Sequence, residues 1–351
     1  MRHETHDTTP AAGRGPWRRI FPLLACLLPI CLGAGCSDAQ FERRTYVLTT
    51  GTTGGTYYPV GVALSTLVSA QPGEDYSLTA ISSAGSLENL KLLRDNQAQF
   101  GLILGLFAAW AWEGTGPVNA PQPHLRAVAA TWPNVEHFVL HADLVSTGTL
   151  DDLANLDGER FVLGQRNSGA EQSGSYILDA IGVDFRSRFS LAYMGYGSVA
   201  GAMQDGNIVG MNVPAGAPVA GITQSFAQMR DRIAILGFTQ AHLDAINREL
   251  PLWNFYQLPA GTYPHQNVDV TTASSPNVLV ARADVPEAIV YELTRLMWES
   301  LPTLREIHGA TREMTLGRAL AGVLIPLHPG ALRYYEEAGV EIPPALKPPG
   351  N

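Results

Sequence analysis

The sequence predicts an α/β protein of two lobes, each built on a mainly parallel sheet, with a ligand cleft between the lobes. Strand-like and helix-like stretches alternate over residues 45–142, and the same alternation restarts near residue 150. Glycine- and serine-rich turns follow many of the strand-like stretches, and the 315 residues after position 36 are enough for two lobes. We therefore expect lobe 1 at 45–142, lobe 2 at 143–266, and a return to lobe 1 with C-terminal helices at 267–345.

Residues 1–36 have the composition of a signal peptide and are excluded from the fold. Arg14, Arg18 and Arg19 form a positive flank before the apolar run 20–32, which is too short for a stable membrane anchor. Cys36 follows small residues and resembles the cysteine of a bacterial lipobox, although Gly33 stands where leucine is usual. We expect lipidation of Cys36 and a periplasmic or extracytoplasmic location, with simple cleavage or an uncleaved anchor as alternatives.

Cysteine usage and charge exclude several classes of function. Cys26, Cys31 and Cys36 are the three cysteines of the sequence, so the part after the signal peptide offers no disulfide and no thiolate metal site. The formal net charge is −9, and removal of the arginine-rich signal peptide makes it more negative. This argues against nucleic acid as a partner. An anionic ligand is still allowed, because helix N-termini and a few arginines reverse the field locally.

The stretch 46–61 joins a strand, a glycine-rich turn and the start of a helix. Its first residues are rich in β-formers, and the apolar residues after Pro59 recur at helical spacing. Gly54 and Gly55 let the backbone approach a ligand closely, and Pro59 suits the first helical turn. The free N–H groups of a helix start favour a carboxylate. An ordinary β–α turn is the alternative, and neither common nucleotide-binding loop is present.

The other elements follow in order along the chain. In lobe 1 we expect strands at 76–81, 99–104, 125–131 and 136–141, and a helix after the turn 82–86. In lobe 2 we expect a helical connection at 150–158, strands at 160–164, 189–194 and 208–213, and helices at 173–181, 197–205 and after 218. The Val/Thr-rich run 267–282 leads back to lobe 1, and 285–307 predicts one long closing helix.

Several motifs occur in a recognisable order along nearly the whole chain after the signal peptide. They are Gly-Gly-Thr-Tyr-Tyr-Pro-Val-Gly at 54–61, Gly-Ser-Leu-Glu-Asn-Leu at 85–90, Asp152-Leu with Leu-Asp-Gly158, Ser-Gly-Ala-Glu at 168–171, Gly-Thr-Tyr at 261–263, and the segments 326–331 and 334–339. In these motifs the chain resembles the TAXI family, the extracytoplasmic solute receptors of tripartite ATP-independent periplasmic (TRAP) transporters.

The resemblance implies a two-lobed periplasmic binding protein of the type II-like class. Such a receptor captures a small organic acid, here glutamate, 2-oxoglutarate or a related C4 or C5 dicarboxylate, and delivers it to a TRAP membrane permease. No cofactor is expected, and the membrane is contacted only through the lipid anchor. The alternative is a bilobal receptor for an ABC importer or a sensor kinase that binds a different small solute.

The expected ligand-binding residues come from this resemblance and from the chemistry of the turns. They are Thr53, Gly54, Gly55, Thr56, Tyr57, Gly85, Ser86, Arg166, Ser168, Gly169, Tyr196, Pro214 and Gly216. Hydroxyl and backbone N–H groups bind a carboxylate with charge-assisted hydrogen bonds of about 1.5–3 kcal/mol each. Arg166 is a candidate clamp for a carboxylate, with a surface position as the alternative. Leu106 and Phe107 stand where the family usually has a polar pair, and they favour a less polar acid.

Catalysis is not expected. The sequence contains no H-E-x-x-H and no G-x-S-x-G pattern, and no cysteine nucleophile follows the signal peptide. His137 and His141 are four residues apart but lie in a strand-like stretch, so we expect no metal site there. His328 is expected in a structural turn. Glu88 and Glu171 are expected to cap helix starts.

Overall fold

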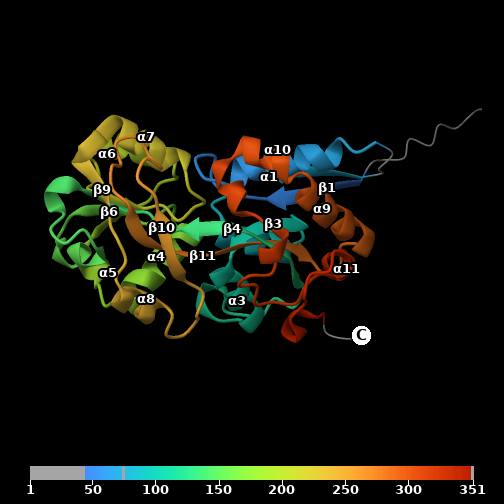
Figure 1. The fold of residues 1–351 in the computed structure, drawn as a ribbon. Coiled ribbons are helices and arrows are strands. Elements are labelled where there is room, and N and C mark those ends of the chain that lie inside the picture. Colours follow the sequence, from blue (N-terminus) through green and yellow to red (C-terminus); the bar gives the residue numbers. More distant parts are fainter. Residues whose placement is uncertain (1–43, 73–75, 349–351) are drawn as a thin grey trace, which may run out of the picture. The chain divides into compact units, whose positions relative to one another are not determined.

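The strand-like stretches form two sheets in the computed structural model, which describes residues 44–72 and 76–348 (Figure 1). Both sheets lie in one structural unit that spans residues 42–351. The signal peptide and the lipidation predicted at Cys36 lie outside the described residues. Within the described ranges, no helix is both long and apolar enough to cross a membrane.

The first sheet has six strands in the order β10-β11-β3-β1-β2, with β4 paired to β11. The strands are β1 (Arg44–Thr49), β2 (Tyr76–Ile81), β3 (Phe100–Leu104), β4 (Leu125–Val135), β10 (Asn254–Leu258) and β11 (Val270–Arg282). β1 runs parallel to β2 and β3. β11 runs antiparallel to β3, β4 and β10, so the segment that follows the second sheet in sequence completes the first sheet.

The second sheet has five strands in the order β7-β6-β8-β5-β9. The strands are β5 (Phe138–His141), β6 (Arg160–Val162), β7 (Ser190–Ala192), β8 (Gly210–Asn212) and β9 (Ile233–Ile235). β6 runs parallel to β7 and β8, whereas β5 runs antiparallel to β8 and β9. Each sheet therefore contains one parallel triplet, and the expected mainly parallel arrangement is wrong for the strands outside the triplets.

Helices connect the parallel strands in both sheets. α1 (Tyr57–Ser69) and α2 (Ser86–Arg94) do so in the first sheet, and α4 (Gly169–Ala180), α5 (Phe185–Arg188) and α6 (Val199–Gln204) in the second. The remaining α-helices are α3 (Gly105–Glu113), α7 (Ala220–Met229), α8 (Gln240–Ile246), α9 (Glu287–Glu299), α10 (Leu301–Ile307) and α11 (Pro329–Glu337). Short 3-10 helices lie at Gly116–Val118, Ala142–Leu144, Leu150–Asn155, Arg230–Arg232, Gly309–Glu313, Leu316–Arg318 and Pro344–Leu346.

Two predicted boundaries are wrong for physical reasons. β4 continues to Val135 through the Trp-Pro-Asn segment that we expected to separate two strands, because β11 pairs with it there across an irregular register. The single helix expected at 285–307 is two helices, α9 and α10, which meet at Ser300. Pro302 lies in the first turn of α10, where its missing N–H is tolerated, whereas inside a longer helix it would remove a hydrogen bond.

The C-terminal helices are fixed to the first sheet by a buried chain of hydrogen bonds. Trp298 Nε1 of α9 donates to Tyr335 OH of α11 at 3.1 Å, and this hydroxyl donates to the carbonyl oxygen of Val128 in β4 at 2.9 Å. Tyr335 is fully buried. The apolar residues at helical spacing in α9, such as Leu293 and Met297, are buried in the same core, as expected.

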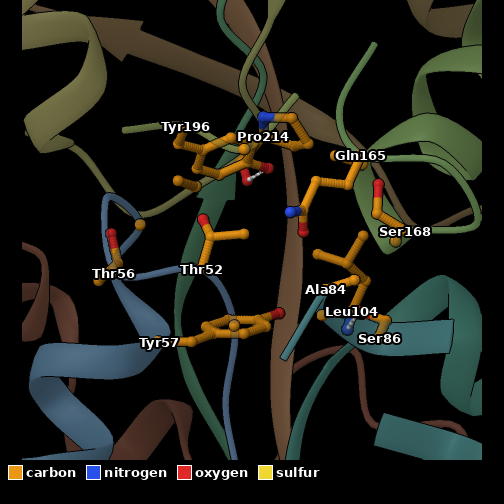
Figure 2. Close-up of a pocket in the computed structure, with 17 residues that line it drawn as sticks. Thr52, Thr56, Tyr57, Ala84, Ser86, Leu104, Gln165, Ser168, Tyr196 and Pro214 are labelled. Atoms are coloured by element: carbon orange, nitrogen blue, oxygen red, sulfur yellow. Dashed lines mark hydrogen bonds between the residues drawn. The ribbon is translucent and has the colours of Figure 1, made fainter. Parts of the chain in front are cut away.

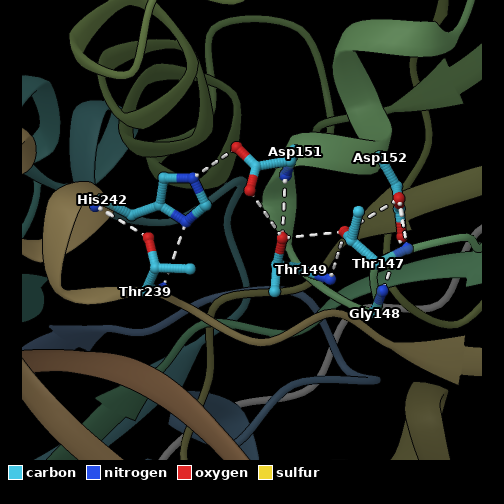
Figure 3. Close-up of polar contacts among 7 residues, drawn as sticks. All are labelled: Thr147, Gly148, Thr149, Asp151, Asp152, Thr239 and His242. Atoms are coloured by element: carbon cyan, nitrogen blue, oxygen red, sulfur yellow. Dashed lines mark hydrogen bonds and ion pairs between the residues drawn. The ribbon is translucent and has the colours of Figure 1, made fainter.

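Between β5 and β6, a buried carboxylate organises the loop before the Leu150–Asn155 helix (Figure 3). Asp152 has no exposed surface, and its carboxylate accepts from Ser146 Oγ, from Thr147 N and Oγ1, and from Gly148 N, all at 2.7–2.9 Å. Burial by itself raises the pKa of Asp152, but these hydrogen bonds outweigh it and the pKa lies below its usual value. The loop in turn exchanges backbone hydrogen bonds with Gly237.

We expect Asp152→Asn to lower the free energy of unfolding by about 2–3 kcal/mol at pH 7, because an amide nitrogen would face donors that now meet an oxygen. The folded-state pKa is depressed, so the wild-type advantage is present above the usual value of 3.8 and is lost as the pH falls through the folded-state pKa. Urea titrations at pH 7 and pH 3 measure both effects. Asp157→Asn, at an exposed position, is the matched control. A wild-type midpoint for Asp152→Asn at pH 7 would exclude this role.

Candidate functional site

A pocket lies at the carboxyl ends of the parallel strands of both sheets (Figure 2). It contains about 520 Å³ of space not filled by atoms, its mouth included. We call it the inner pocket. Its lining residues are Gly51, Thr52, Gly55, Thr56 and Tyr57 after β1, Ala84, Gly85 and Ser86 after β2, Leu104 at the end of β3, Gln165, Ser168, Gly169 and Ala170 after β6, Gly195 and Tyr196 after β7, and Pro214 and Ala215 after β8. Strand order thus positions the site, as in other open α/β sheets.

Three helices begin at the inner pocket. The first residues of α1, α2 and α4 are Tyr57, Ser86 and Gly169, and all three line it. The first N–H groups of a helix have no acceptor within the helix and carry partial positive charge. α4 is capped by Ser168, whose Oγ accepts from Glu171 N at 3.1 Å, and this leaves the amides of Gly169 and Ala170 for another acceptor.

Hydrogen bonds fix most polar side chains of the inner pocket. Thr56 Oγ1 donates to Gly216 O at 2.7 Å, Tyr57 OH to Asn277 Oδ1 at 2.5 Å, and Tyr196 OH to Pro214 O at 3.0 Å. Ser86 Oγ accepts from Leu104 N at 3.1 Å. Burial raises the pKa of the Tyr57 and Tyr196 hydroxyls, so both stay neutral. The pocket therefore presents dipoles in fixed directions and no ionised phenol.

Turns from the two sheets touch each other at glycines. A Cβ atom on Gly54 would lie 2.6 Å from the backbone nitrogen of Gly197, and one on Gly169 would lie 2.8 Å from Ser86 Oγ. The Thr56–Gly216 hydrogen bond joins the same two groups of turns. A side chain at Gly54 or Gly169 would hold the turns apart, so glycine permits the close approach that covers the inner pocket.

Nine of the thirteen residues predicted to bind ligand line the inner pocket. They are Gly55, Thr56, Tyr57, Gly85, Ser86, Ser168, Gly169, Tyr196 and Pro214. Gly216 lies against the Trp132 ring, where it accepts the Thr56 hydrogen bond and does not reach the pocket surface. Gly54 contributes the contact between turns described above.

Thr53 and Arg166 line a second, more open cavity, which we call the outer pocket. It shares Thr52, Ala84, Gln165 and Gly195 with the inner pocket, so the two lie next to each other. Arg166 is exposed, and its guanidinium lies 3.9 Å from the centre of the Tyr193 ring. Because Arg166 lines the outer pocket and not the inner one, a clamp at Arg166 would act on the part of a ligand that extends into the outer pocket.

The sequence prediction missed eight lining residues. They are Gly51, Thr52, Ala84, Leu104, Gln165, Ala170, Gly195 and Ala215. Seven of them, all except Leu104, are direct neighbours of predicted residues or of one another in the same turns. The apolar wall is formed by Leu104 and not by Leu106 or Phe107, which are buried in α3. β3 ends at Leu104, and the helix turns the following side chains into the core.

The remaining candidate residues have structural partners. His137 Nε2 accepts from Tyr263 OH at 2.8 Å while Nδ1 donates to Val213 O at 2.9 Å, and burial lowers the pKa of His137 to about 4. His328 caps α11 by accepting from Gly330 N. Glu88 accepts from Ala84 N at its helix start, as expected for a cap. Within residues 44–72 and 76–348, no group of three acidic, His or Cys residues is placed to bind a metal ion.

Comparisons with known proteins agree with this architecture. A protein-family model described as the NMT1-like family matches residues 48–339. MatC from Rhodopseudomonas palustris with bound malate has a TM-score of 0.51 at 15% identity, over 84% of this chain and 97% of that chain. PhnD1 from Prochlorococcus marinus in complex with methylphosphonate has a TM-score of 0.50 at 13% identity, over 77% and 91%. A binding protein component of an ABC phosphonate transporter from Pseudomonas aeruginosa has a TM-score of 0.47 at 11% identity, over 77% and 79%. The first two matches show the two-lobed fold of periplasmic binding proteins, and the predicted fold class is confirmed.

A buried acid lies where the chain passes from the first sheet to the second. Glu136 separates β4 from β5 and has no exposed surface. Its Oε2 accepts from Asn212 Nδ2 at 2.9 Å, whereas no hydrogen-bond partner for Oε1 occurs among the described residues. Burial raises the pKa of Glu136 to about 7. The raised pKa puts the ionisation of this carboxyl near neutral pH, at the crossing between the sheets.

We expect Glu136→Gln to remove a pH-dependent loss of stability. The folded-state pKa is raised, so the wild type is most stable below the usual value of 4.5 and loses stability as the pH rises through about 7. The free energy of unfolding of the variant, relative to wild type, should therefore rise by about 1 kcal/mol or more between pH 4 and pH 8. Urea titrations across this range measure it, with Glu341→Gln at an exposed position as control. Parallel pH profiles for Glu136→Gln and wild type would contradict the expectation.

Proposed function

We propose, from the premise that the chain belongs to the NMT1-like family, that it is an extracytoplasmic receptor that binds a small organic acid without converting it. One observation carries the proposal. Three helix N-termini, two from the first sheet and one from the second, meet at a pocket formed by the ends of both parallel triplets. Such N-termini favour an anion, and a pocket between two sheets suits a ligand that joins them.

In this proposal the acid group of the ligand lies between the starts of α2 and α4. Amides at Ser86, Gly169 and Ala170 converge there from opposite sheets, and each charge-assisted hydrogen bond contributes about 1.5–3 kcal/mol. An acid that bonds to both helix starts favours the conformation in which the turns touch. The conformation in which the turns are apart makes fewer of these bonds. The touching turns also exclude water, which strengthens the same hydrogen bonds.

The identity of the acid is also a proposal. The motif resemblance implies glutamate, 2-oxoglutarate or a related C4 or C5 dicarboxylate, and these are the first acids to test. The two matched structures with TM-scores of at least 0.50 contain malate and methylphosphonate, which are both small anions. They support a compact anion as the class of ligand. They do not identify the acid, which must be inferred from the residues that line the pocket of this chain.

The membrane partner has two candidates. The first candidate is an ABC importer, or a sensor kinase that uses the same kind of receptor. It comes first because the matched phosphonate-binding protein is described as a component of an ABC transporter. A TRAP permease is the second candidate and rests on the resemblance of the motifs to the TAXI family. A neighbouring gene for an ATPase favours the first and a multispanning permease gene the second. Attachment to the membrane through a lipid on Cys36 belongs to the same proposal.

A thermal-shift screen of the exported protein against organic acids, amino acids, sugars and peptides tests the ligand class. An acid present at 100 times its Kd should add about 2.7 kcal/mol to the apparent free energy of unfolding. Calorimetry confirms the binding, and NMR of the mixture should show the acid unchanged after prolonged incubation. Stabilisation by a sugar or peptide but by no acid would refute the proposed ligand class, and consumption of the acid would refute a receptor without catalysis.

Substitution of Gly54 tests whether contact between the turns is required for binding. Gly54→Val places a side chain where a Cβ atom lies 2.6 Å from Gly197 N, so we expect the affinity for the acid to fall at least about tenfold. The melting temperature without ligand should change little, because the turn lies outside the core. Gly317→Val, at an exposed glycine with nothing near its Cβ position, is the control. Equal affinities of Gly54→Val and wild type would remove this contact from the mechanism.

A further inference from the structure

The inner pocket offers a ligand no charged side chain from the described residues. Among the described residues that line it, none is Asp, Glu, His, Lys or Arg. The nearest arginine, Arg166, lines the outer pocket and stacks on Tyr193. The helix starts supply partial positive charge for one acid group. A second carboxylate inside this pocket would lose its hydration without meeting a cation, and that costs far more than burying a neutral group.

Two polar side chains of the lining have no hydrogen-bond partner among the residues that the structure describes. Thr52 Oγ1 is buried from solvent and has no hydrogen-bond partner among the described residues. The side chain of Gln165 is half-buried and makes no hydrogen bond to the described residues, and Figure 2 shows its carboxamide directed into the pocket on the side where Thr52 lies. The other polar side chains shown there are committed to the protein, as with Tyr196 and Thr56. Unpaired polar groups aimed into a cavity point to a ligand group that pairs with them.

We infer that Gln165 and Thr52 select a neutral hydrogen-bonding group on the ligand, so that the receptor takes a monocarboxylate with an amide, hydroxyl or keto group in preference to a dicarboxylate. The inference rests on the proposed function, because it assigns the second end of an acid whose first end is bound at α2 and α4. A carboxamide offers both an acceptor and two N–H donors, and a threonine hydroxyl adds one donor and two acceptor lone pairs. Together they satisfy an amide or hydroxyl and do not neutralise a carboxylate.

Matched acids of one chain length provide the test. Butyrate, succinamate and succinate share four carbons and differ only in whether the far end is a methyl, an amide or a carboxylate; pentanoate, glutaramate and glutarate repeat the series with five. Calorimetry on the exported protein at pH 7 should show the monoamide binding at least about tenfold more tightly than both relatives of its series, because a polar site left unpaired penalises the wrong end group.

Gln165→Met tests the residue, because methionine keeps the length of the side chain and removes its hydrogen-bonding group. The preference for the monoamide should fall below about threefold, because the monoamide loses its partner and the alkyl acid no longer leaves a polar group unpaired. Gln172→Met, the same change in α4 outside the pocket lining, should behave as wild type. An unchanged preference in Gln165→Met, or wild-type binding of the dicarboxylate as tight as that of the monoamide, overturns the inference and leaves the receptor function standing.

Thr52→Val provides a second test, which measures both the melting temperature without ligand and the affinity for the monoamide. A purely structural role of Thr52 would change the first quantity and not the second. Removing an unpaired buried hydroxyl should raise the melting temperature of the ligand-free protein and at the same time weaken binding of the monoamide. A raised melting temperature with unchanged monoamide affinity assigns Thr52 to packing and contradicts its part in the inference. If no acid of either series binds, the proposed function fails for such acids, and the inference fails with it.

Discussion

Everything that lines the inner pocket depends on one constraint: parallel strands expose their carboxyl ends at the same edge of a sheet. β1 and β6 each lie in the middle of a parallel triplet, so three turns gather at the edge of each sheet. Helices begin directly after several of these turns because the chain must reverse to reach the next parallel strand. The convergence of helix starts at the pocket therefore follows from strand order, and side chains only refine what the backbone already offers.

The antiparallel strands add what the triplets lack, a continuous path between the sheets. β4 leads directly through Glu136 into β5, and Thr272 of β11 donates to the carbonyl oxygen of Glu136 at 2.7 Å. Two segments far apart in sequence are thus bonded at the crossing. A carboxyl that ionises near neutral pH lies at this point, while the contacts between Gly54 and Gly197 lie at the covering turns. The two places where the sheets meet therefore differ in chemistry. The crossing contains a buried polar group, whereas the turns at Gly54 and Gly197 meet through a close approach of their backbones.

The features that depend on local sequence pattern could be predicted from the sequence. The alternation of strand-like and helix-like stretches predicted the strands that form both parallel triplets, and the glycine-rich turn before Pro59 marked the start of α1. Features that depend on distant pairing were missed: β4 extends through Pro133 only because β11 lies beside it. The sequence around Gln165 gave no sign of a binding residue, because a glutamine in a polar turn is usually exposed. Its place in the pocket depends on how closely the turns of the two sheets approach each other. Arg166, next to it in sequence, points instead to Tyr193.

A receptor that uses backbone amides in place of arginines gains reversibility. The protein has a net charge of −9, so attraction of an acid at long range is weak, and selectivity must come from contacts at short range. Amides at α2 and α4 act together only while the turns of the two sheets touch, because they belong to different sheets. On the proposed function, separation of those turns removes the hydrogen bonds from one of the two helix starts to the acid and readmits water. An arginine clamp within one sheet would keep its strongest bond through the same motion. On the proposed function, a pocket free of charged side chains therefore couples release of the acid to movement of the sheets.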